Sequence, residues 1–357
     1  MNNKCKTMRL LGFAAALMSA SLAAHAYELT DLGVDVVPKD INDLNVVVGS
    51  LNSPPGTSVA FRWTAGVLEQ LDGATVANGI NNQGQITGDT LTGAFRFDES
   101  QAVPFADLGD GHTGAAINNL GNIAGSEAGI NPFRSNPLPV NPAVYDGQWH
   151  SPDVASVYPR GRRQGVYAAQ FNLAGYNDSG YAVGKRIKAG LVGSASIMMT
   201  PTLDVVFLPV PYGGHASAIN NQGMIVGTTG SNSRTNEHEQ AYLYDGALAR
   251  RLGTLGGGLT SSAADINEAN QVVGTSWPVS QTTSQVEAEK HHAFLWENGV
   301  MTDLNDLIAP GSGWILTAAT AINNDGSIAG TGLYDGDGDG QREPHGFLLT
   351  ATAGDRP

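Results

Sequence analysis

One turn phrase recurs along the whole chain and constrains its fold more than any other feature. Phrases of the type Ile-Asn-x-x-Gly, each followed by a short apolar run and a further Gly, begin at Ile41, Ile80, Ile117, Tyr176, Ile219, Ile266 and Ile322. Successive starts lie 37 to 59 residues apart. Self-similarity near such a period indicates a propeller or a solenoid, in which one supersecondary unit is repeated.

The fifth copy shows the repeat unit most clearly. Ala216–Ile219 reads as a short strand, Asn220–Gly223 as a turn and Met224–Thr228 as the returning strand, because Asn and Gly tolerate left-handed backbone angles. A variable loop, a third strand at Ala241–Tyr244 and a second hairpin follow. Each unit therefore reads as a four-stranded antiparallel meander. We interpret the turn phrase as scaffold rather than as a repeated ligand site.

The two ends of the chain complement each other. The last copy reaches Leu349 without a fourth strand, and Tyr27–Gly33 resembles a fourth strand that has no repeat of its own. Lending the first strand to the last blade removes open sheet edges. The sequence therefore predicts an all-β fold, a seven-bladed β-propeller of four-stranded antiparallel blades closed by the N-terminal strand. A straight solenoid is the alternative, but it has no use for a split repeat.

The N-terminus has the pattern of a secretory signal peptide. Lys4, Lys6 and Arg9 precede the apolar stretch Leu10–Ala24, and Ala24-His25-Ala26 is an A-x-A cleavage signal. We expect residues 1–26 to be removed and residues 27–357 to form a single propeller domain. A retained N-terminal anchor is the alternative. The protein is expected in the periplasm, on the cell surface or in the medium.

Charge and cysteine content exclude several function classes. Without the three basic residues of the signal, 16 Lys and Arg stand against 33 Asp and Glu, a net charge of −17. Nucleic acid is therefore not an expected partner, because phosphate binding needs a basic surface. The single cysteine, Cys5, lies in the signal, which leaves no disulfide framework or thiol chemistry in the mature chain. No later segment is long and apolar enough to span a membrane.

The repeat phrases resemble those of the HAF-repeat extracellular proteins. The similarity is greatest in Leu252–Leu304, with Leu-Gly-Thr-Leu-Gly-Gly at its start, Ile266-Asn267, Val272-Val273-Gly274 and His292-Ala293-Phe294-Leu295-Trp296. Asn270 stands where that family has Gly. The resemblance implies an exported bacterial repeat protein and brings no catalytic residues with it.

Long insertions point to one face of the expected ring as the binding face. They fall between second and third strands, or between one repeat and the next, and these two connection types share a face in an antiparallel meander. The insertions are Ser126–Asn141, Ser151–Tyr167, Gly230–Gln240, Ser276–His291, Asn305–Gly313 and Leu333–His345. Binding sites concentrate on variable loops over a rigid scaffold.

One of these loops carries the ligand pattern of a calcium site. Residues 335–343 read D-x-D-x-D-G-x-x-E, with Asp335, Asp337, Asp339, Gln341 and Glu343 at the ligand positions. Calcium takes 6 to 8 oxygen ligands, and this spacing supplies carboxylates and a carbonyl oxygen. It is similar to the calcium loops in integrin α-subunit propellers. We predict structural Ca²⁺ here, with a flexible acidic loop as the alternative.

A second set of residues suggests anion recognition. Guanidinium groups bind carboxylate or sulfate in a bidentate manner, and two histidines are expected near the channel mouth. The candidate ligand-binding residues are Tyr158, Arg160, Arg162, Arg163, Tyr167, His112 and His215. The alternative for the arginines is a solvated loop or pairing with neighbouring acids, and the alternative for the histidines is an ordinary polar position at a strand end.

The preferred functional hypothesis is an exported, non-enzymatic, monomeric binding module whose partner is a glycan or a surface protein. The alternative is a glycan-active enzyme, such as a lyase on an anionic polysaccharide, which needs a cation beside the uronate and a His or Tyr to move protons. No catalytic residue is assigned. The sequence shows no zinc motif, nucleophile elbow or phosphate loop.

Overall fold

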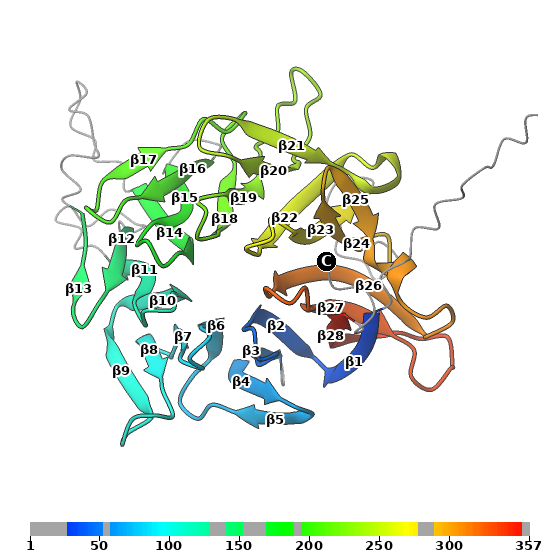
Figure 1. The fold of residues 1–357 in the computed structure, drawn as a ribbon, viewed down its shortest axis with the longest axis horizontal. Helices are drawn as coiled ribbons and strands as arrows, with labels where there is room; N and C mark the ends of the chain where they lie inside the picture. The colour runs from blue at the N-terminus through cyan, green and yellow to red at the C-terminus, as the bar shows by residue number, and fades with distance from the viewer. Residues whose placement is uncertain are drawn as a thin grey trace, which may run out of the picture.

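The computed structural model describes residues 27–52, 58–128, 140–152, 169–188, 194–277 and 289–351. They form antiparallel strands, arranged as sheets around a central opening (Figure 1). The first strand of each repeat lies nearest the centre, and later strands lie progressively further out. No helix in these ranges is long and apolar enough to cross a membrane.

The strands follow the repeats of the sequence. The first two sheets contain β2 (Val36–Ile41), β3 (Val47–Asn52), β4 (Ser58–Thr64) and β5 (Val67–Gln70), then β6 (Val76–Ile80), β7 (Ile86–Asp89), β8 (Gly93–Phe97) and β9 (Phe105–Asp110). The next sheet contains β10 (His112–Ile117), β11 (Ile123–Ala128), β12 (Val140–Tyr145), β13 (Trp149–His150), β14 (Ala169–Tyr176), β15 (Ala182–Lys188), β16 (Ser194–Met199) and β17 (Val205–Phe207).

Three further sheets complete the ring. They contain β18 (His215–Ile219), β19 (Ile225–Thr228), β20 (Ala241–Tyr244) and β21 (Ala249–Gly253); β22 (Thr260–Ile266), β23 (Val272–Trp277), β24 (His292–Glu297) and β25 (Val300–Asp303); and β26 (Trp314–Ile322), β27 (Ile328–Tyr334), β28 (Glu343–Ala351) and β1 (Tyr27–Val34). Two short 3-10 helices, η1 (Leu255–Gly257) and η2 (Leu304–Leu307), follow β21 and β25.

The expectation of seven four-stranded blades is wrong. Five separate four-stranded blades are present, and the repeats that begin at Ile117 and Tyr176 share one eight-stranded sheet. Among the described residues, the outer strand β13 is only two residues long and pairs with Val144 and Tyr145 at one end of β12. At the other end, Val140 of β12 pairs in parallel with Gln170 of β14.

The N-terminal strand does complete the last sheet, as the split repeat predicts. β1 pairs antiparallel with β28 from Tyr27 opposite Ala351 to Val34 opposite His345. Strand pairing nevertheless stays within the individual sheets. Hydrogen bonds between strands therefore do not close the ring into one continuous sheet. Neighbouring sheets are joined by side chains and by bonds from loops, such as that from the Ser261 N–H to the Glu239 carbonyl oxygen.

Apolar side chains fill the spaces between neighbouring sheets. The third strands contribute large buried residues at matching positions, which are Phe61, Phe95, Tyr242, Phe294 and Phe347. One cluster, for example, joins Val273 of β23 to Leu316 and Phe347 of the next sheet. The small-then-large pattern of the third strands is thus a packing pattern between sheets.

The second Gly of each repeat phrase has a steric reason. In the sixth repeat, a Cβ added at Gly274 would lie 2.0 Å from the carbonyl oxygen of Ser262. That carbonyl approaches because the pairing of β22 with β23 shifts register between Ala263 and Asp265. The fifth residue of the phrase, which is Gly in five repeats, has a left-handed backbone. Asn45 and Asn270 adopt this conformation in the two repeats that lack Gly there.

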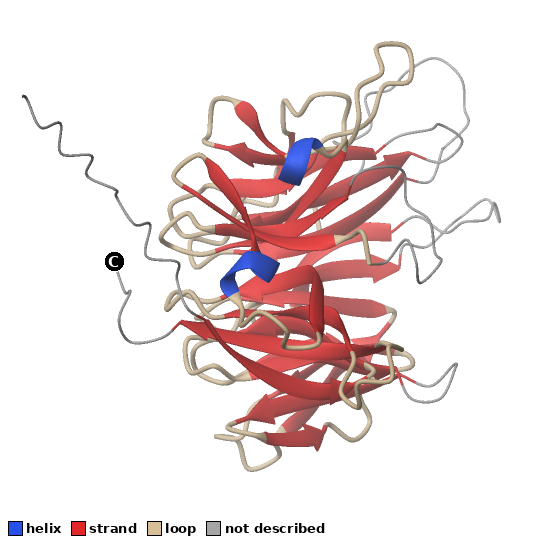
Figure 2. Ribbon diagram, turned by 90° about the vertical axis from the view of Figure 1, so that its right-hand side faces the viewer, coloured by secondary structure: helices blue, strands red, loops and turns tan. Residues whose placement is uncertain are grey.

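The antiparallel meander gives the ring two distinct faces. Connections between first and second strands and between third and fourth strands share one face, which we call the turn face. The remaining connections share the opposite face, which we call the loop face. Figure 2 shows the ring from the side, with connections at both faces.

Candidate functional site

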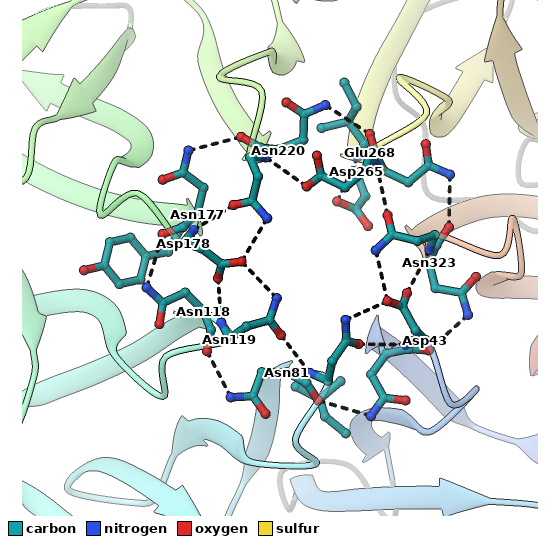
Figure 3. A pocket seen from close by; sticks show the side chains of 18 of the residues that line it. Asp43, Asn81, Asn118, Asn119, Asn177, Asp178, Asn220, Asp265, Glu268 and Asn323 are labelled. Carbon is teal, nitrogen blue, oxygen red and sulfur yellow. Dashed lines mark hydrogen bonds between the residues drawn. The ribbon is translucent and has the colours of Figure 1, made fainter.

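A closed cycle of asparagine side chains surrounds the central opening at the turn face (Figure 3). In every repeat the Asn of the turn phrase donates its side-chain N–H to the backbone carbonyl oxygen of the same Asn in the next repeat, over 2.9 to 3.2 Å. We call these seven residues the inner cycle: Asn42, Asn81, Asn118, Asn177, Asn220, Asn267 and Asn323. The last donates to the first. All are buried, with 2 to 4% of their surface exposed.

Each inner-cycle side chain also holds its own turn together. The Oδ1 atom of Asn220, for example, accepts the backbone N–H groups of Gln222 and Met224 at 3.1 and 3.0 Å. The backbone N–H of Asn220 in turn donates to the Met224 carbonyl oxygen. The oxygen of this amide therefore accepts hydrogen bonds within its own turn, and the nitrogen donates one to the neighbouring repeat. Local turn geometry and assembly of the ring depend on the same side chain.

A second cycle, more exposed, lies one residue further along the chain. Here the residue after each inner-cycle Asn donates its backbone N–H to a side-chain oxygen of the equivalent residue in the next repeat. These bonds are 2.7 to 3.0 Å long. We call this the outer cycle: Asp43, Asn82, Asn119, Asp178, Asn221, Glu268 and Asn324. Asp43 also accepts the side-chain amides of Asn82 and Asn324, and Asp178 accepts those of Asn119 and Asn221.

The two cycles line a polar pocket of about 150 Å³ at the mouth of the channel. Four carboxylates are among its lining residues: Asp43, Asp178, Asp265 and Glu268. Among the lining residues of the part of the chain that the structure describes there is no Lys, Arg or His. The pocket therefore presents negative charge on a framework of hydrogen bonds that fixes the carboxylates in place.

Two aspartates on first strands, Asp40 of β2 and Asp265 of β22, link neighbouring sheets. Asp40 accepts the backbone N–H groups of Ile41 and Ile80, both at 2.8 Å. Asp265 accepts those of Ile266 and Ile322, at 2.8 and 2.9 Å. The pKa of Asp40 is raised to about 7, mainly by burial and to a smaller extent by the negative charge of Asp265. Burial raises the pKa of Asp265 to about 6, although its two N–H donors act in the opposite direction.

The predicted calcium loop lies on the loop face, between β27 and β28. One carboxylate oxygen from each of Asp335, Asp337 and Asp339 lies within 4.8 Å of the others. Oxygen ligands at 2.3 to 2.6 Å from one calcium ion fit within that span. Glu343 is not part of this group and begins β28, where it lies opposite Tyr334. Gln341 donates its backbone N–H to Asp339 at 2.7 Å.

An aromatic stack anchors this acidic loop. The ring of Tyr334 stacks on Trp314 at 4.8 Å, and His345 meets both rings edge-on. On the loop side, Gly336 leaves no room for a Cβ beside the Tyr334 ring. The backbone N–H of Asp335 also donates to the Gly313 carbonyl oxygen. The loop therefore starts from a rigid base at the end of the last sheet.

The structure describes two of the seven remaining candidate residues, His112 and His215. Tyr158, Arg160, Arg162, Arg163 and Tyr167 lie outside the described residues. The ring of His112, at the start of β10, stacks on Trp149 at 4.5 Å, and its Nδ1 lies 3.2 Å from the Asp110 carbonyl oxygen. His215 begins β18, and burial followed by the nearby charge of Lys185 lowers its pKa.

Sequence reasoning missed the pocket at the turn face. It treated the turn phrase as local geometry, so the turn face was expected to be plain. The signal was nevertheless present in the residue after each inner-cycle Asn, which is acidic in three repeats, at Asp43, Asp178 and Glu268. Closure into a ring brings these positions to one mouth.

Comparisons with known proteins support the fold and leave the activity open. Residues 211–342 match a family model described as "Protein of unknown function (DUF3466)". No curated protein matches the sequence. These findings give no support to the resemblance to the HAF-repeat proteins.

Solved structures with a similar fold are distant in sequence. The β-propeller domain of the trilobed protease from Pyrococcus furiosus, described as having an open velcro topology, matches with a TM-score of 0.51 and 13% identity, over 77% of this chain and 85% of that chain. The acylaminoacyl peptidase of Pyrococcus horikoshii matches with a TM-score of 0.51 and 12% identity, over 92% of this chain and 53% of that one. Such low identities show a β-propeller fold alone.

We predict that the inner cycle contributes far more stability than the outer cycle. Replacing Asn220→Ala removes one link between repeats and leaves the buried carbonyl group of Asn267 and the partly buried N–H groups of Gln222 and Met224 without their partner. Each such group costs about 1–3 kcal/mol, so we expect a loss of about 3 kcal/mol or more in the free energy of unfolding. Asn221→Ala, at the exposed outer position, is expected to cost about 1 kcal/mol or less. Chemical denaturation measures both, and equal losses would contradict the prediction.

The raised pKa values of Asp40 and Asp265 predict a pH dependence of stability. The folded protein retains protons on Asp40 and Asp265 that the unfolded chain, with an ordinary pKa of 3.8, has already released. Their unfavourable ionisation therefore reduces stability as the pH rises from about 4 through 7. We expect Asp40→Asn to weaken the decrease in Tm between pH 5.5 and pH 8.

The control for this measurement is Asp72→Asn, which alters an exposed carboxylate. It should leave the pH dependence of Tm as it is in the unmodified protein. If Asp40→Asn shows the same decrease in Tm as the unmodified protein, ionisation of Asp40 does not destabilise the fold.

Proposed function

We propose that this protein is an exported, non-enzymatic binding module whose propeller presents ligand-binding loops on the loop face. The observation that carries the proposal is the anchored loop at Asp335–Glu343, which rises from the Tyr334–Trp314 stack at the edge of a rigid sheet. A loop that is ordered before binding loses less conformational entropy when a ligand arrives. A rigid scaffold with long loops at one face is a common arrangement for recognition.

The ligand class that suits this face is an extracellular glycan or a protein of the cell surface. Carboxylates of the loop offer hydrogen-bond acceptors, and the adjacent aromatic rings offer partly exposed apolar surface. The signal-like N-terminus agrees with a place outside the cytoplasm. The lyase alternative draws on Arg160, Arg162, Arg163, Tyr158 and Tyr167, which the structure does not describe, and no observation favours it.

A screen of glycan arrays and soluble polysaccharides tests the proposal, with binding and product formation measured on the same purified sample. We expect saturable binding of at least one glycan or surface protein and no release of shortened chains. Asp337→Ala should weaken that binding, while Asp72→Ala should leave it unchanged. Release of unsaturated oligosaccharides would show that the protein is a lyase and contradict the proposal. A ligand that binds both variants equally would show that the loop is not part of the binding site.

We further propose that Ca²⁺ binds Asp335, Asp337 and Asp339 and stabilises the loop in the binding conformation. The three carboxylates are close enough to share one ion, which would offset their mutual repulsion. A ligand that binds only the folded state raises its stability by mass action. We expect calorimetry to show binding heat with Ca²⁺ and Tm to rise, and both effects to vanish in Asp337→Ala but persist in Asp72→Ala. An unchanged response in Asp337→Ala would place any calcium site elsewhere.

A further inference from the structure

The turn face has the features of a second recognition surface, distinct from the loop face. Its central pocket of about 150 Å³ is lined by the carboxylates of Asp43, Asp178, Asp265 and Glu268 without a basic residue among the described lining. Next to it lies a groove of about 310 Å³ between the first two sheets. Pocket and groove share Asn42 and Ile80, so they adjoin.

The groove differs from the pocket in chemistry. Its wall includes the aliphatic side chains of Leu44 and Val46, which follow the inner-cycle Asn of the first repeat, together with polar residues of the turns in the first two sheets. Leu44 is 71% exposed, so it presents apolar surface to solvent beside the acidic mouth. Among the described lining residues of the groove, Arg62 is the one basic residue, and it already pairs with Glu69 at 2.6 Å and Glu99 at 2.8 Å. Its charge is therefore neutralised, and the groove adds no repulsion toward a cation.

The ring itself does not require negative charge at the three acidic positions of the outer cycle. The outer cycle needs a side-chain oxygen that accepts a backbone N–H, and Asn82, Asn119, Asn221 and Asn324 supply it as amides. Asp43, Asp178 and Glu268 supply the same bond while adding three negative charges. Like charges around one mouth repel one another, so they weaken the ring unless a cation neutralises them.

We propose that the turn face binds a polypeptide segment of a partner protein, with a Lys or Arg side chain in the acidic pocket and an apolar side chain one or two residues away in the groove beside Leu44. Charge complementarity selects the cationic side chain. The aliphatic side chains of Leu44 and Val46 in the adjoining groove favour a polypeptide over an inorganic cation, because an apolar side chain of the peptide can pack on them. The proposal goes beyond the proposed function, since it uses the opposite face of the ring.

The geometry also explains how such a segment would be held. The second oxygen of Asp178 accepts two side-chain amides, from Asn119 at 3.1 Å and Asn221 at 2.9 Å. Carboxylates fixed in this way need little reorganisation when a cation arrives, and such preorganisation increases affinity. The strong negative charge of the chain additionally accelerates the approach of a basic partner.

Selection from random eight-residue peptides displayed on phage tests the proposal on the purified protein. We expect the recovered peptides to carry Lys or Arg followed within about two residues by Leu, Ile or Phe. Their affinity, measured by fluorescence anisotropy, should fall at least tenfold in the double variant Asp178→Asn with Glu268→Gln, which keeps the two oxygens that accept backbone N–H groups in the outer cycle. A similar loss is expected in Leu44→Ser, an exposed change that leaves the core intact.

Asp339→Asn is the matched control, because it removes a carboxylate from the loop face and should not alter peptide affinity. Recovery of no peptides, of peptides without a basic residue, or of peptides that bind all variants equally would overturn the proposal. Binding of anionic phosphatidylglycerol vesicles that is lost in Leu44→Ser would assign the face to a membrane surface and would also overturn it. Failure of the glycan screen on the loop face has no bearing on these outcomes.

Discussion

The bond from an asparagine side chain to the backbone carbonyl of the next repeat is the interaction on which the arrangement of the sheets depends. Strand pairing is confined to the individual sheets, and apolar packing between them has no preferred direction. The inner cycle adds a directional link at a fixed point of each repeat, from Asn42 around to Asn323 and back. Because each amide also closes its own turn, a repeat is joined to its neighbour only when its turn is correctly formed.

The eight-stranded sheet shows how much variation this arrangement tolerates. The third and fourth repeats differ from the others at their outer strands, where β13 is reduced to Trp149–His150 and β12 meets β14. At the centre the same two repeats remain regular, since Asn118 still donates to the Asn177 carbonyl oxygen at 3.2 Å. Irregularity at the perimeter and regularity at the centre are expected when the centre carries the directional bonds.

Repetition made most of the architecture predictable, and the missing parts depend on contacts between distant residues. The third-strand pattern around Phe294, the turn at Asn220–Gly223 and the pairing of Tyr27–Val34 with the last sheet all follow from one repeat read against another. The number of separate blades did not follow, because the fusion at Val140 and Gln170 depends on pairing between strands of two repeats.

The site was less predictable than the fold for a related reason. The carboxylates of Asp335, Asp337 and Asp339 lie within one short segment, so their proximity could be anticipated from spacing. Those of Asp43, Asp178 and Glu268 are more than 80 residues apart along the chain and meet only because the ring closes. In a single repeat such an acidic residue is indistinguishable from an ordinary turn residue. It becomes part of a charged pocket only when the ring places the equivalent residue of every repeat around one opening.

Charge at the turn face links stability to recognition. Asp265 lines the pocket and lies close enough to Asp40 for its charge to raise the pKa of that carboxyl. A cationic side chain in the pocket favours the ionised form of Asp265, so it removes part of the cost that ionisation imposes on the fold near neutral pH. A bound cationic side chain therefore offsets the destabilisation that repulsion between these carboxylates causes. By linkage, a cationic segment binds more tightly where these groups are ionised.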